Sequence, residues 1–260
     1  MNAPTPRPRV ICHMIITVDG RIVADRWPDI GEGRREYERT ASTYAADAWM
    51  CGRVTMQHFA GAARGEDELA RDAAAPPTAG AARGDYLAPG AHPSYAVAVD
   101  PRGRLLWSAN AIDGDHVVAI LGGGVSDDYL AGLREIGVSY LLAGAGGDEV
   151  DLALALEKLA ATFGIRTLLL EGGGKINGSM LQAGLVDEVS LLVAPIADGT
   201  IGTASVFDVE LPHGEQRPSH GGRRLELIAV ERRAEGVLWV RYRVEATPRQ
   251  PAAAGQRGAS

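Results

Sequence analysis

The chain has 260 residues, and its 26 Lys and Arg against 33 Asp and Glu give a formal charge of −7 at neutral pH. This acidic balance argues against a nucleic-acid binder, whose affinity rests on neutralising phosphates with a basic surface. Hydrophobic residues make up 46% of the chain and aromatic residues only 5%, so we expect a sizeable core built from aliphatic side chains. The two cysteines, Cys12 and Cys51, are too few for a disulfide framework or a four-thiolate zinc site.

The composition also predicts how the chain is organised. Residues 1–8 and 248–260 are rich in Pro, Ala and Gly, and we expect disordered tails there around one domain over residues 9–247. Residues 61–93, with Pro76-Pro77 and repeated glycines, are expected to form a long surface excursion that holds one short helix. The N-terminus resembles no signal peptide, and apolar runs fall far short of the roughly 20 residues that cross a bilayer. We therefore expect a cytoplasmic protein without a membrane partner.

Short β-branched runs alternate with helical patterns along the chain. In chain order we expect a strand over Val10–Val18, a helix over Glu36–Ala46, a strand over Ala48–Cys51, a short helix near Glu66–Ala73, strands over Tyr95–Val99 and Val117–Leu121, a helix over Ser126–Glu135, a strand over Ser139–Leu142, a helix over Leu152–Phe163, a strand over Ile165–Leu170, a helix over Ile176–Gln182, a strand over Glu188–Pro195, and a hairpin of Leu225–Glu231 with Val237–Glu245. This alternation, closed by a hairpin, predicts an α/β fold with a mostly parallel sheet and an antiparallel edge.

The most informative segment runs from Thr167 to Ser179, with the sequence TLLLEGGGKINGS. A buried-strand pattern ends in glycines 172–174, and a helical pattern begins directly after them. Glycines allow the positive φ angles of a tight turn and the close approach of a ligand, and N–H groups at a helix start attract phosphate. The segment indicates a phosphate-binding loop, with a plain strand-to-helix turn as the alternative. Its spacing fits neither the G-x-G-x-x-G fingerprint nor a P-loop.

A second segment, DAWMCGRVTMQHF over residues 47–59, places Gly52, Arg53 and Thr55 between a strand and the start of a helix. Thr55 can donate a hydrogen bond to a phosphate, and Arg53 can pair with one. The alternative is a helix cap beside a surface arginine. Because two strand ends in one parallel sheet can flank one ligand, the two segments together favour dinucleotide binding.

GRVTM at Gly52–Met56, EGGGKINGSML at Glu171–Leu181 and GLVDEVSLLVAPIADG at Gly184–Gly199 together resemble the dihydrofolate-reductase superfamily. Within it, the chain is most similar to the C-terminal reductase domain of the bacterial bifunctional riboflavin-biosynthesis deaminase-reductase. That family also has an N-terminal strand ending in a Ser/Thr-x-Asp-Gly turn, here Thr17–Gly20. The resemblance, which covers about Val10 to Glu245, implies a three-layer dihydrofolate-reductase-like fold with a mostly parallel central sheet. It also implies an NADPH-dependent reductase that forms a homodimer.

Carried over by position, the resemblance assigns three groups of residues to NADPH. The glycine loop would hold the pyrophosphate, the start of the helix after Gly52 would form its other side, and the end of the first strand would lie near the nicotinamide. These groups are, respectively, Gly172, Gly173, Gly174, Lys175, Ile176, Asn177 and Ser179; Gly52, Arg53 and Thr55; and Ile15, Ile16 and Thr17.

The resemblance also places two acids and one aromatic residue beside the substrate. Glu171, the last residue before the glycines, matches a substrate-contacting acid of the riboflavin reductases. Asp19 matches the family's aspartate at the strand end, although Asp-Gly is also a common turn former. Trp27 could cover the substrate or the nicotinamide, or anchor its own loop.

The sequence departs from the riboflavin reductases after Thr55. Those reductases typically continue with an Asp-x-Pro…Thr-Val-Arg stretch that reads the ribose phosphate of the substrate, whereas this chain has Gln57-His58-Phe59 and then the excursion. The reductase chemistry therefore transfers more safely than the substrate. Arg102, in the turn after Val99, could read the NADPH 2′-phosphate or belong to a solvated turn. Glycines 122–124 could approach the adenosine half of the cofactor or form a bare turn.

We therefore predict hydride transfer from NADPH to the carbon of a C=N or C=O group in a small heterocyclic or ribosylaminopyrimidine-like substrate. An acid must protonate the heteroatom, and the sequence leaves Asp19 and Glu171 as alternatives. Two other functions stay open. One is a specialised-pathway reductase of the same fold that does not accept riboflavin precursors, and the other is a non-catalytic dinucleotide-binding protein. No metal ion is expected.

Overall fold

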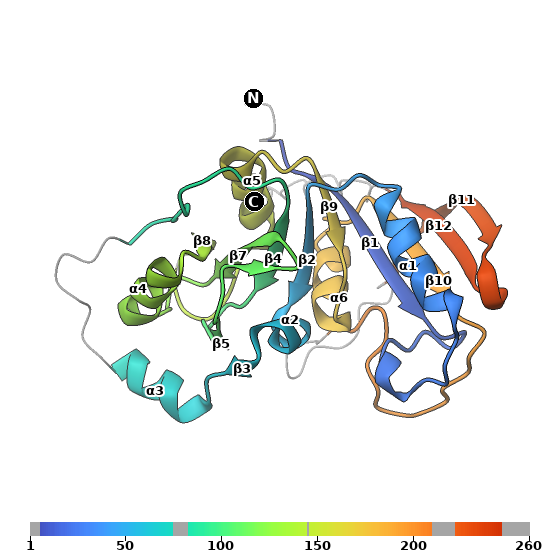
Figure 1. The fold of residues 1–260 in the computed structure, drawn as a ribbon, viewed down its shortest axis with the longest axis horizontal. Helices are drawn as coiled ribbons and strands as arrows, with labels where there is room; N and C mark the ends of the chain where they lie inside the picture. Colours follow the sequence, from blue (N-terminus) through green and yellow to red (C-terminus); the bar gives the residue numbers. More distant parts are fainter. Residues whose placement is uncertain (1–5, 75–82, 145, 210–221, 246–260) are drawn as a thin grey trace, which may run out of the picture.

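The computed structural model describes residues 6–74, 83–144, 146–209 and 222–245, and Figure 1 shows their arrangement. The predicted tails and the middle of the predicted excursion lie largely outside these residues. Arg7, which falls within the predicted N-terminal tail, forms a two-pronged ion pair with Asp187, with both N···O distances at 2.8 Å.

Within the described residues, the main sheet has ten strands in the order β11-β12-β10-β1-β9-β2-β4-β7-β6, with β8 also paired to β7. The strands from β10 to β7, and β8 beside β7, pair in parallel. The hairpin of β11 and β12 at one end and β6 at the other pair antiparallel. The strands are β1 Arg9–Ile16, β2 Ala48–Gly52, β4 Tyr95–Val99, β6 Ala111–Ile112, β7 Asp115–Leu121, β8 Ser139–Leu142, β9 Thr167–Leu170, β10 Glu188–Val193, β11 Leu225–Arg232 and β12 Leu238–Val244. A separate pair joins β3 Ala62–Ala63 to β5 Leu105–Leu106.

Helices cover both faces of this sheet and give the chain three layers (Figure 1). On one face, the aliphatic side chains of β1, β9 and β10 pack against α5 and α6; on the other, β2, β4 and β7 pack against α2 and α4, while α1 covers β1, β10 and β12. The helices are α1 Glu32–Ser42, α2 Arg53–Ala60, α3 Glu66–Ala74, α4 Asp127–Ile136, α5 Leu152–Phe163 and α6 Gly174–Gln182, with 3-10 turns at Ala24–Arg26 and Ala234–Gly236. The predicted three-layer α/β fold is confirmed.

Several predicted elements match the structure residue for residue, including β4, β8 and α5. The first strand ends at Ile16 rather than Val18, because Thr17 and Gly20 close a turn through a 2.9 Å backbone bond. The first helix begins four residues before the predicted Glu36, after Gly31 with its positive φ of 51°. The two-residue strands β3, β5 and β6 were not predicted, since runs this short carry no periodicity.

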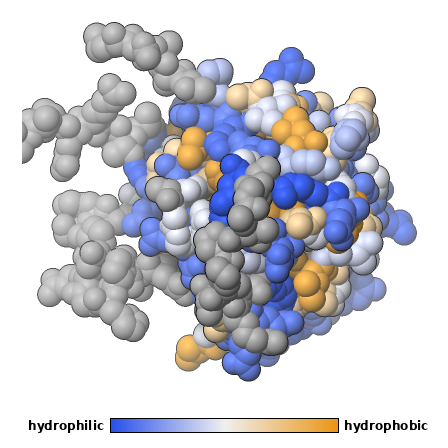
Figure 2. Space-filling view, turned by 90° about the vertical axis from the view of Figure 1, so that its left-hand side faces the viewer, coloured by the Kyte–Doolittle hydropathy of each residue, from blue (hydrophilic) through white to orange (hydrophobic). Residues whose placement is uncertain are grey.

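The surface on the α3 and α4 side is mostly hydrophilic, with small scattered apolar patches (Figure 2). In the part of the chain that the structure describes, no helix is both long enough and apolar enough to span a membrane. The same residues hold no cluster of three or more His, Cys, Asp or Glu side chains suited to a metal ion.

Candidate functional site

The sheet order places three strand ends side by side. β9 lies between β1 and β2, with Leu170 of β9 opposite Cys12 of β1 and Met50 of β2. The strands are parallel, so the segments that follow them leave the sheet at one edge. These segments are the turn at Asp19, the glycine loop after Glu171 and the start of α2 after Gly52. The structure thus brings together the three groups of residues that the resemblance assigned to the cofactor.

The glycine loop and the start of α2 are in direct contact. The Gly52 N–H donates to the Gly172 carbonyl over 2.7 Å. A side chain at Gly173 would have Thr55 Oγ1 as its nearest neighbour, 3.6 Å from the Cβ position. Gly52 and Gly173 are the N-caps of α2 and α6, and neither helix has a side-chain cap, whereas Ser126 and Asp151 cap α4 and α5. Two uncapped helix starts beside an open backbone fit a bound pyrophosphate.

The other two glycines of the loop are required by the backbone conformation at Gly172 and by close packing at Gly174. Gly172 has a positive φ of 98°, follows a strand and precedes a cis peptide bond to Gly173. A Cβ at Gly174 would lie 2.1 Å from the Ser205 carbonyl oxygen, so only glycine fits there. The neighbouring Asn177 is fully buried, and its side-chain amide donates to the Val206 carbonyl over 3.0 Å. These residues hold segment 205–208 against the start of α6.

The remaining loop residues predicted to contact NADPH differ in exposure. Lys175 and Ser179 are exposed on α6, and Ile176 is half-buried and faces Gly52, with its Cγ2 3.3 Å from a Cβ built at that glycine. Ile176 therefore joins the loop to the start of α2.

Asp19 anchors a second loop at the end of β1. Its carboxylate accepts hydrogen bonds from Thr17 Oγ1 at 2.7 Å, from Asp198 N at 3.1 Å and from Gly199 N at 2.9 Å. These three donors favour the ionised form and hold the pKa of Asp19 well below its usual range. Asp19 is therefore a carboxylate at neutral pH that fixes the loop after β10.

Glu171 has the opposite character. Burial raises the pKa of its carboxyl from 4.5 to about 8, and the nearby acids Glu38 and Asp115 act in the same direction, while Tyr37 acts against them. Its backbone is fixed between strands, since the Glu171 N–H donates to the Met50 carbonyl over 2.8 Å and the Cys51 thiol donates to its carbonyl over 3.4 Å. Glu171 is mainly protonated at neutral pH.

The residues predicted near the nicotinamide point in different directions. Ile15 is half-buried on the face that α1 covers, where it packs with Tyr37 and Trp239. Ile16 is buried in the core on the opposite face, and Thr17 uses its hydroxyl within the turn. Trp27 is half-buried after the first 3-10 turn, and its indole Nε1 is buried without a hydrogen-bond partner among the described residues.

Arg102 lies farther along the same sheet edge, beyond β4. Its guanidinium pairs with Glu66 at 3.0 Å and with Asp148 at 3.1 Å. Arg102 and Gly124 line one small pocket of about 110 Å³, together with Ser126 at the start of α4. The structure thus brings together the two weaker candidates for the adenosine half of NADPH. Arg53, half-buried at the start of α2, is bonded to Gln57 at 2.9 Å.

Two features of this region carry no clear sequence signal. The segment that contains Ser205 and Asp208 covers α6. This contact could not be predicted, because the segment is far from the glycine loop in the sequence. Tyr37 lies on α1 and interacts with Glu171. Its position within a predicted helix was visible in the sequence, but the register of that helix on the sheet was not.

The mostly parallel sheet, with a glycine loop after β9 and an uncapped helix after β2, has the dihydrofolate-reductase-like fold that related reductase structures share. The chain belongs to the RibD C-terminal domain family, whose profile matches residues 8–239. The resemblance seen in the sequence is therefore confirmed.

Two relatives match parts of the chain. One is a 2,5-diamino-6-ribosylamino-4(3H)-pyrimidinone 5′-phosphate reductase of Methanothermobacter thermautotrophicus, 47% identical over 66 residues, which are 25% of this chain and 30% of the relative. The other is the riboflavin biosynthesis protein RibD of Actinobacillus pleuropneumoniae, 41% identical over 73 residues, which are 27% of this chain and 19% of the relative. The matched segments thus span less than a third of either relative.

Solved structures share the fold over most of the chain. A pyrimidine reductase-like protein of Corynebacterium diphtheriae superposes with a TM-score of 0.62 at 16% identity and covers 94% of both chains. Acinetobacter baumannii RibD gives 0.60 at 19% identity, covering 92% of this chain and 58% of its own. The Saccharomyces cerevisiae riboflavin biosynthesis reductase Rib7 gives 0.57 at 12% identity, covering 94% and 93%.

Proposed function

We propose that this protein is an NADPH-dependent reductase that transfers a hydride to the carbon of a C=N or C=O group in a ribosylaminopyrimidine-like substrate. The observation that carries the proposal is the junction of the glycine loop with the start of α2, where Gly52 N–H meets the Gly172 carbonyl at 2.7 Å. This junction sets two uncapped helix starts next to Glu171, an acid that is protonated at neutral pH.

The residues at this junction fit NADPH. Backbone N–H groups at the starts of α2 and α6 would bind the pyrophosphate, and Gly173 would allow its close approach because its Cβ position is open on all sides but that of Thr55. Bound NADPH supplies the hydride, and the protein aligns it and excludes water. Ile15, at the end of β1, and Trp27 would border the nicotinamide, while Arg102 would read the 2′-phosphate by exchanging its carboxylate partners for it.

Glu171 is the better candidate for the proton donor. As hydride reaches the substrate carbon, the attached nitrogen or oxygen gains negative charge and needs a proton. A carboxyl with a pKa of about 8 holds its proton at neutral pH and releases it readily, whereas Asp19 is ionised. Asp19 then serves the site by fixing the loop after β10 and contacts the substrate as a carboxylate.

A specialised substrate is the second candidate, and the segment after Thr55 favours it. Where the riboflavin reductases carry the phosphate-reading stretch, Gln57 is bonded to Arg53 and Phe59 packs edge-on against Trp49 with ring centroids 5.5 Å apart. Gln57 and Phe59 thus contact other side chains of the protein, and neither carries a positive charge that could bind a ribose phosphate.

The exposed edge of the sheet supports a homodimer. β11 is the edge strand, and three of its apolar side chains are exposed, Leu227 at 55%, Ile228 at 42% and Val230 at 53%. A second copy would cover this edge through a twofold axis. Light scattering at micromolar concentration is expected to give twice the chain mass of 27.4 kDa, and the chain mass itself would argue against a dimer.

We place the enzyme in the cytoplasm, where the pools of NADPH and of small biosynthetic intermediates meet.

The test of the function is turnover. Purified protein is incubated with NADPH and either 2,5-diamino-6-ribosylamino-4(3H)-pyrimidinone 5′-phosphate or dihydrofolate. Oxidation of NADPH with the first compound alone supports the proposal. Tight NADPH binding without turnover of either compound favours the specialised reductase or the non-catalytic binder.

A further inference from the structure

A row of side chains crosses the sheet beneath α1 at the level of Glu171. Because Cys12 and Met50 lie opposite Leu170, the next residues along these strands, His13, Glu171 and Cys51, share the opposite face of the sheet. α1 covers this face and carries Tyr37. The proposed reaction uses Glu171 from this row but leaves Tyr37 without a role.

Tyr37 is held against His13 by reciprocal contacts. Its hydroxyl donates to the His13 carbonyl over 3.2 Å, and its own carbonyl lies 3.2 Å from His13 Nε2. The two rings stack with centroids 4.6 Å apart and an interplanar angle of 29°. His13 is itself fixed from the other side, since its Nδ1 lies 2.9 Å from Ser190 Oγ. The position of the Tyr37 phenol is therefore set by the strand beneath it.

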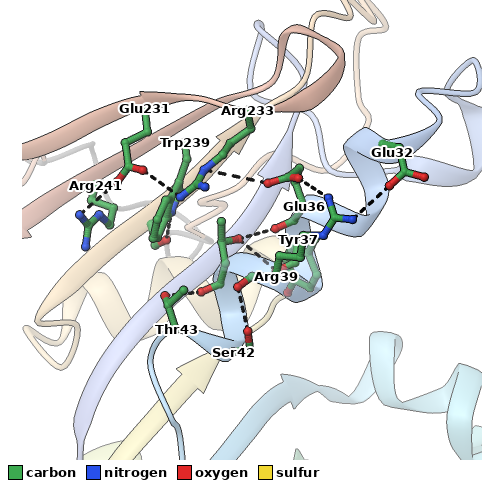
Figure 3. Close-up of polar contacts among 12 residues, drawn as sticks. Glu32, Glu36, Tyr37, Arg39, Ser42, Thr43, Glu231, Arg233, Trp239 and Arg241 are labelled. Carbon is green, nitrogen blue, oxygen red and sulfur yellow. Dashed lines mark hydrogen bonds and ion pairs between the residues drawn. The ribbon is translucent and has the colours of Figure 1, made fainter.

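The helix that carries Tyr37 is anchored to the C-terminal hairpin, as Figure 3 shows. The buried Glu36 carboxylate pairs with Arg39 at 2.6 Å and faces Arg233 at 4.0 Å. Arg233 in turn lies over the Trp239 ring, 4.7 Å from its centroid. These contacts fix the rotation of α1 and keep Tyr37 turned towards the sheet.

Tyr37 and Glu171 lie close enough to shift each other's pKa. Burial, and after it the charge of the nearby Glu171, raises the pKa of Tyr37 well above 10, so its hydroxyl stays a neutral donor. The other groups that face Glu171 are Glu38 from α1, Asp115 from β7 and the thiol of Cys51 from β2, whose pKa is also raised well above 9. Of these, Tyr37 alone favours the ionised form of Glu171.

We propose that Tyr37 is a positioning residue whose hydroxyl turns between two acceptors, donating to the His13 carbonyl while Glu171 is protonated and to the Glu171 carboxylate once the acid has given up its proton. In the first state the Glu171 O–H can donate either to the Tyr37 hydroxyl oxygen or to the substrate. In the second state the O–H of Tyr37 stabilises the new carboxylate. Only the Glu171 proton is transferred, from its carboxyl oxygen to the substrate heteroatom.

This proposal rests on the proposed function, and Tyr37→Phe tests it because the variant keeps the ring stacked on His13. Tyr44→Phe is the matched control, since Tyr44 lies on the same face beyond α1 and donates to Glu188 over 2.8 Å, away from Glu171. A hydrogen bond to a charged group is worth enough to lower kcat about 10- to 100-fold in Tyr37→Phe and to move the alkaline limb of its pH profile upward by about one unit. NADPH affinity is expected to stay unchanged in both variants, and Tyr44→Phe is expected to match the wild type.

A second readout does not depend on activity. The unfolding free energy of the wild type and of Glu171→Gln is measured against pH, and the same pair is compared in the Tyr37→Phe background. The difference within each pair reports the titration of Glu171, and its midpoint is expected to rise by about one unit when the hydroxyl is removed. Coinciding midpoints would overturn the role of Tyr37 whether or not turnover is found. A shifted midpoint without turnover would keep the contact and contradict the proposed function instead.

Discussion

Two neighbouring glycines of the loop are expected to respond in opposite ways to a side chain. At Gly173 a new Cβ has no neighbour nearer than Thr55 Oγ1 at 3.6 Å, an ordinary contact, so Gly173→Val is expected to leave the melting temperature of the cofactor-free protein within a few degrees of the wild type. The added methyl groups would occupy the space proposed for the pyrophosphate. Overpacking costs on the order of 1–3 kcal/mol, which raises the NADPH dissociation constant roughly 5- to 150-fold.

Gly174 provides the matched contrast. A Cβ there would lie 2.1 Å from the Ser205 carbonyl oxygen and 2.7 Å from Asp208 Oδ2, so Gly174→Ala must displace segment 205–208. A cost of about 3 kcal/mol lowers the melting temperature by about 6–12 °C in a chain of this size. Both variants are examined by thermal melting without cofactor and by calorimetric titration with NADPH. A large loss of stability in Gly173→Val with normal affinity would refute the reasoning, because these glycines would then only turn the chain.

Three further outcomes are expected. The pKa of Glu171 is raised from 4.5 to about 8 in the folded state, so wild-type stability falls as pH rises between these values. Glu171→Gln is therefore expected to gain about 5 kcal/mol relative to wild type above pH 8 and nothing near pH 4, as urea unfolding at several pH values will show. Burial lowers the pKa of His13 from 6.5 to about 4, so the protein loses stability as pH falls between these values and His13 takes up a proton on unfolding. His13→Gln is expected to remove about 3 kcal/mol of this loss of stability. An unchanged dependence of stability on pH would contradict this expectation. Arg102→Ala is expected to weaken NADPH about tenfold or more and to leave NADH unchanged in calorimetric titrations, whereas equal effects on both would assign Arg102 to its ion pairs with Glu66 and Asp148.

The sequence predicts the fold well because its strands are buried on both faces and read as continuous aliphatic runs. Tyr95–Val99 and Ser139–Leu142 are such runs, and Leu152–Phe163 ends at Gly164, which adopts the left-handed conformation of a helix C-cap. Helix α1 was displaced by four residues because its start is set by tertiary contacts. Gly33 packs against Val237 and Ile30, and Glu36 is buried against the hairpin, contacts that no local pattern contains.

The sequence predicted which positions form the candidate site but not the role of each residue in it. The motif pairs the glycine loop with Gly52, and the structure joins them by a backbone hydrogen bond. The sequence could not distinguish Gly173, which lies open, from Gly174, which is closed by a segment 31 positions further on. Nor could it rank the two acids, because the pKa of Asp19 depends on donors at Thr17, Asp198 and Gly199, and the pKa of Glu171 depends on burial.

The central claim is that hydride passes from NADPH to a substrate carbon on this chain. The most direct measurement uses NADPH that carries deuterium at its transferable position, together with the ribosylaminopyrimidine phosphate, and determines the mass of the reduced product. The account predicts a product that carries one deuterium bound to carbon, formed in step with the loss of NADPH absorbance. A reduced product without deuterium, or no loss of NADPH in the presence of the folded protein, would contradict it.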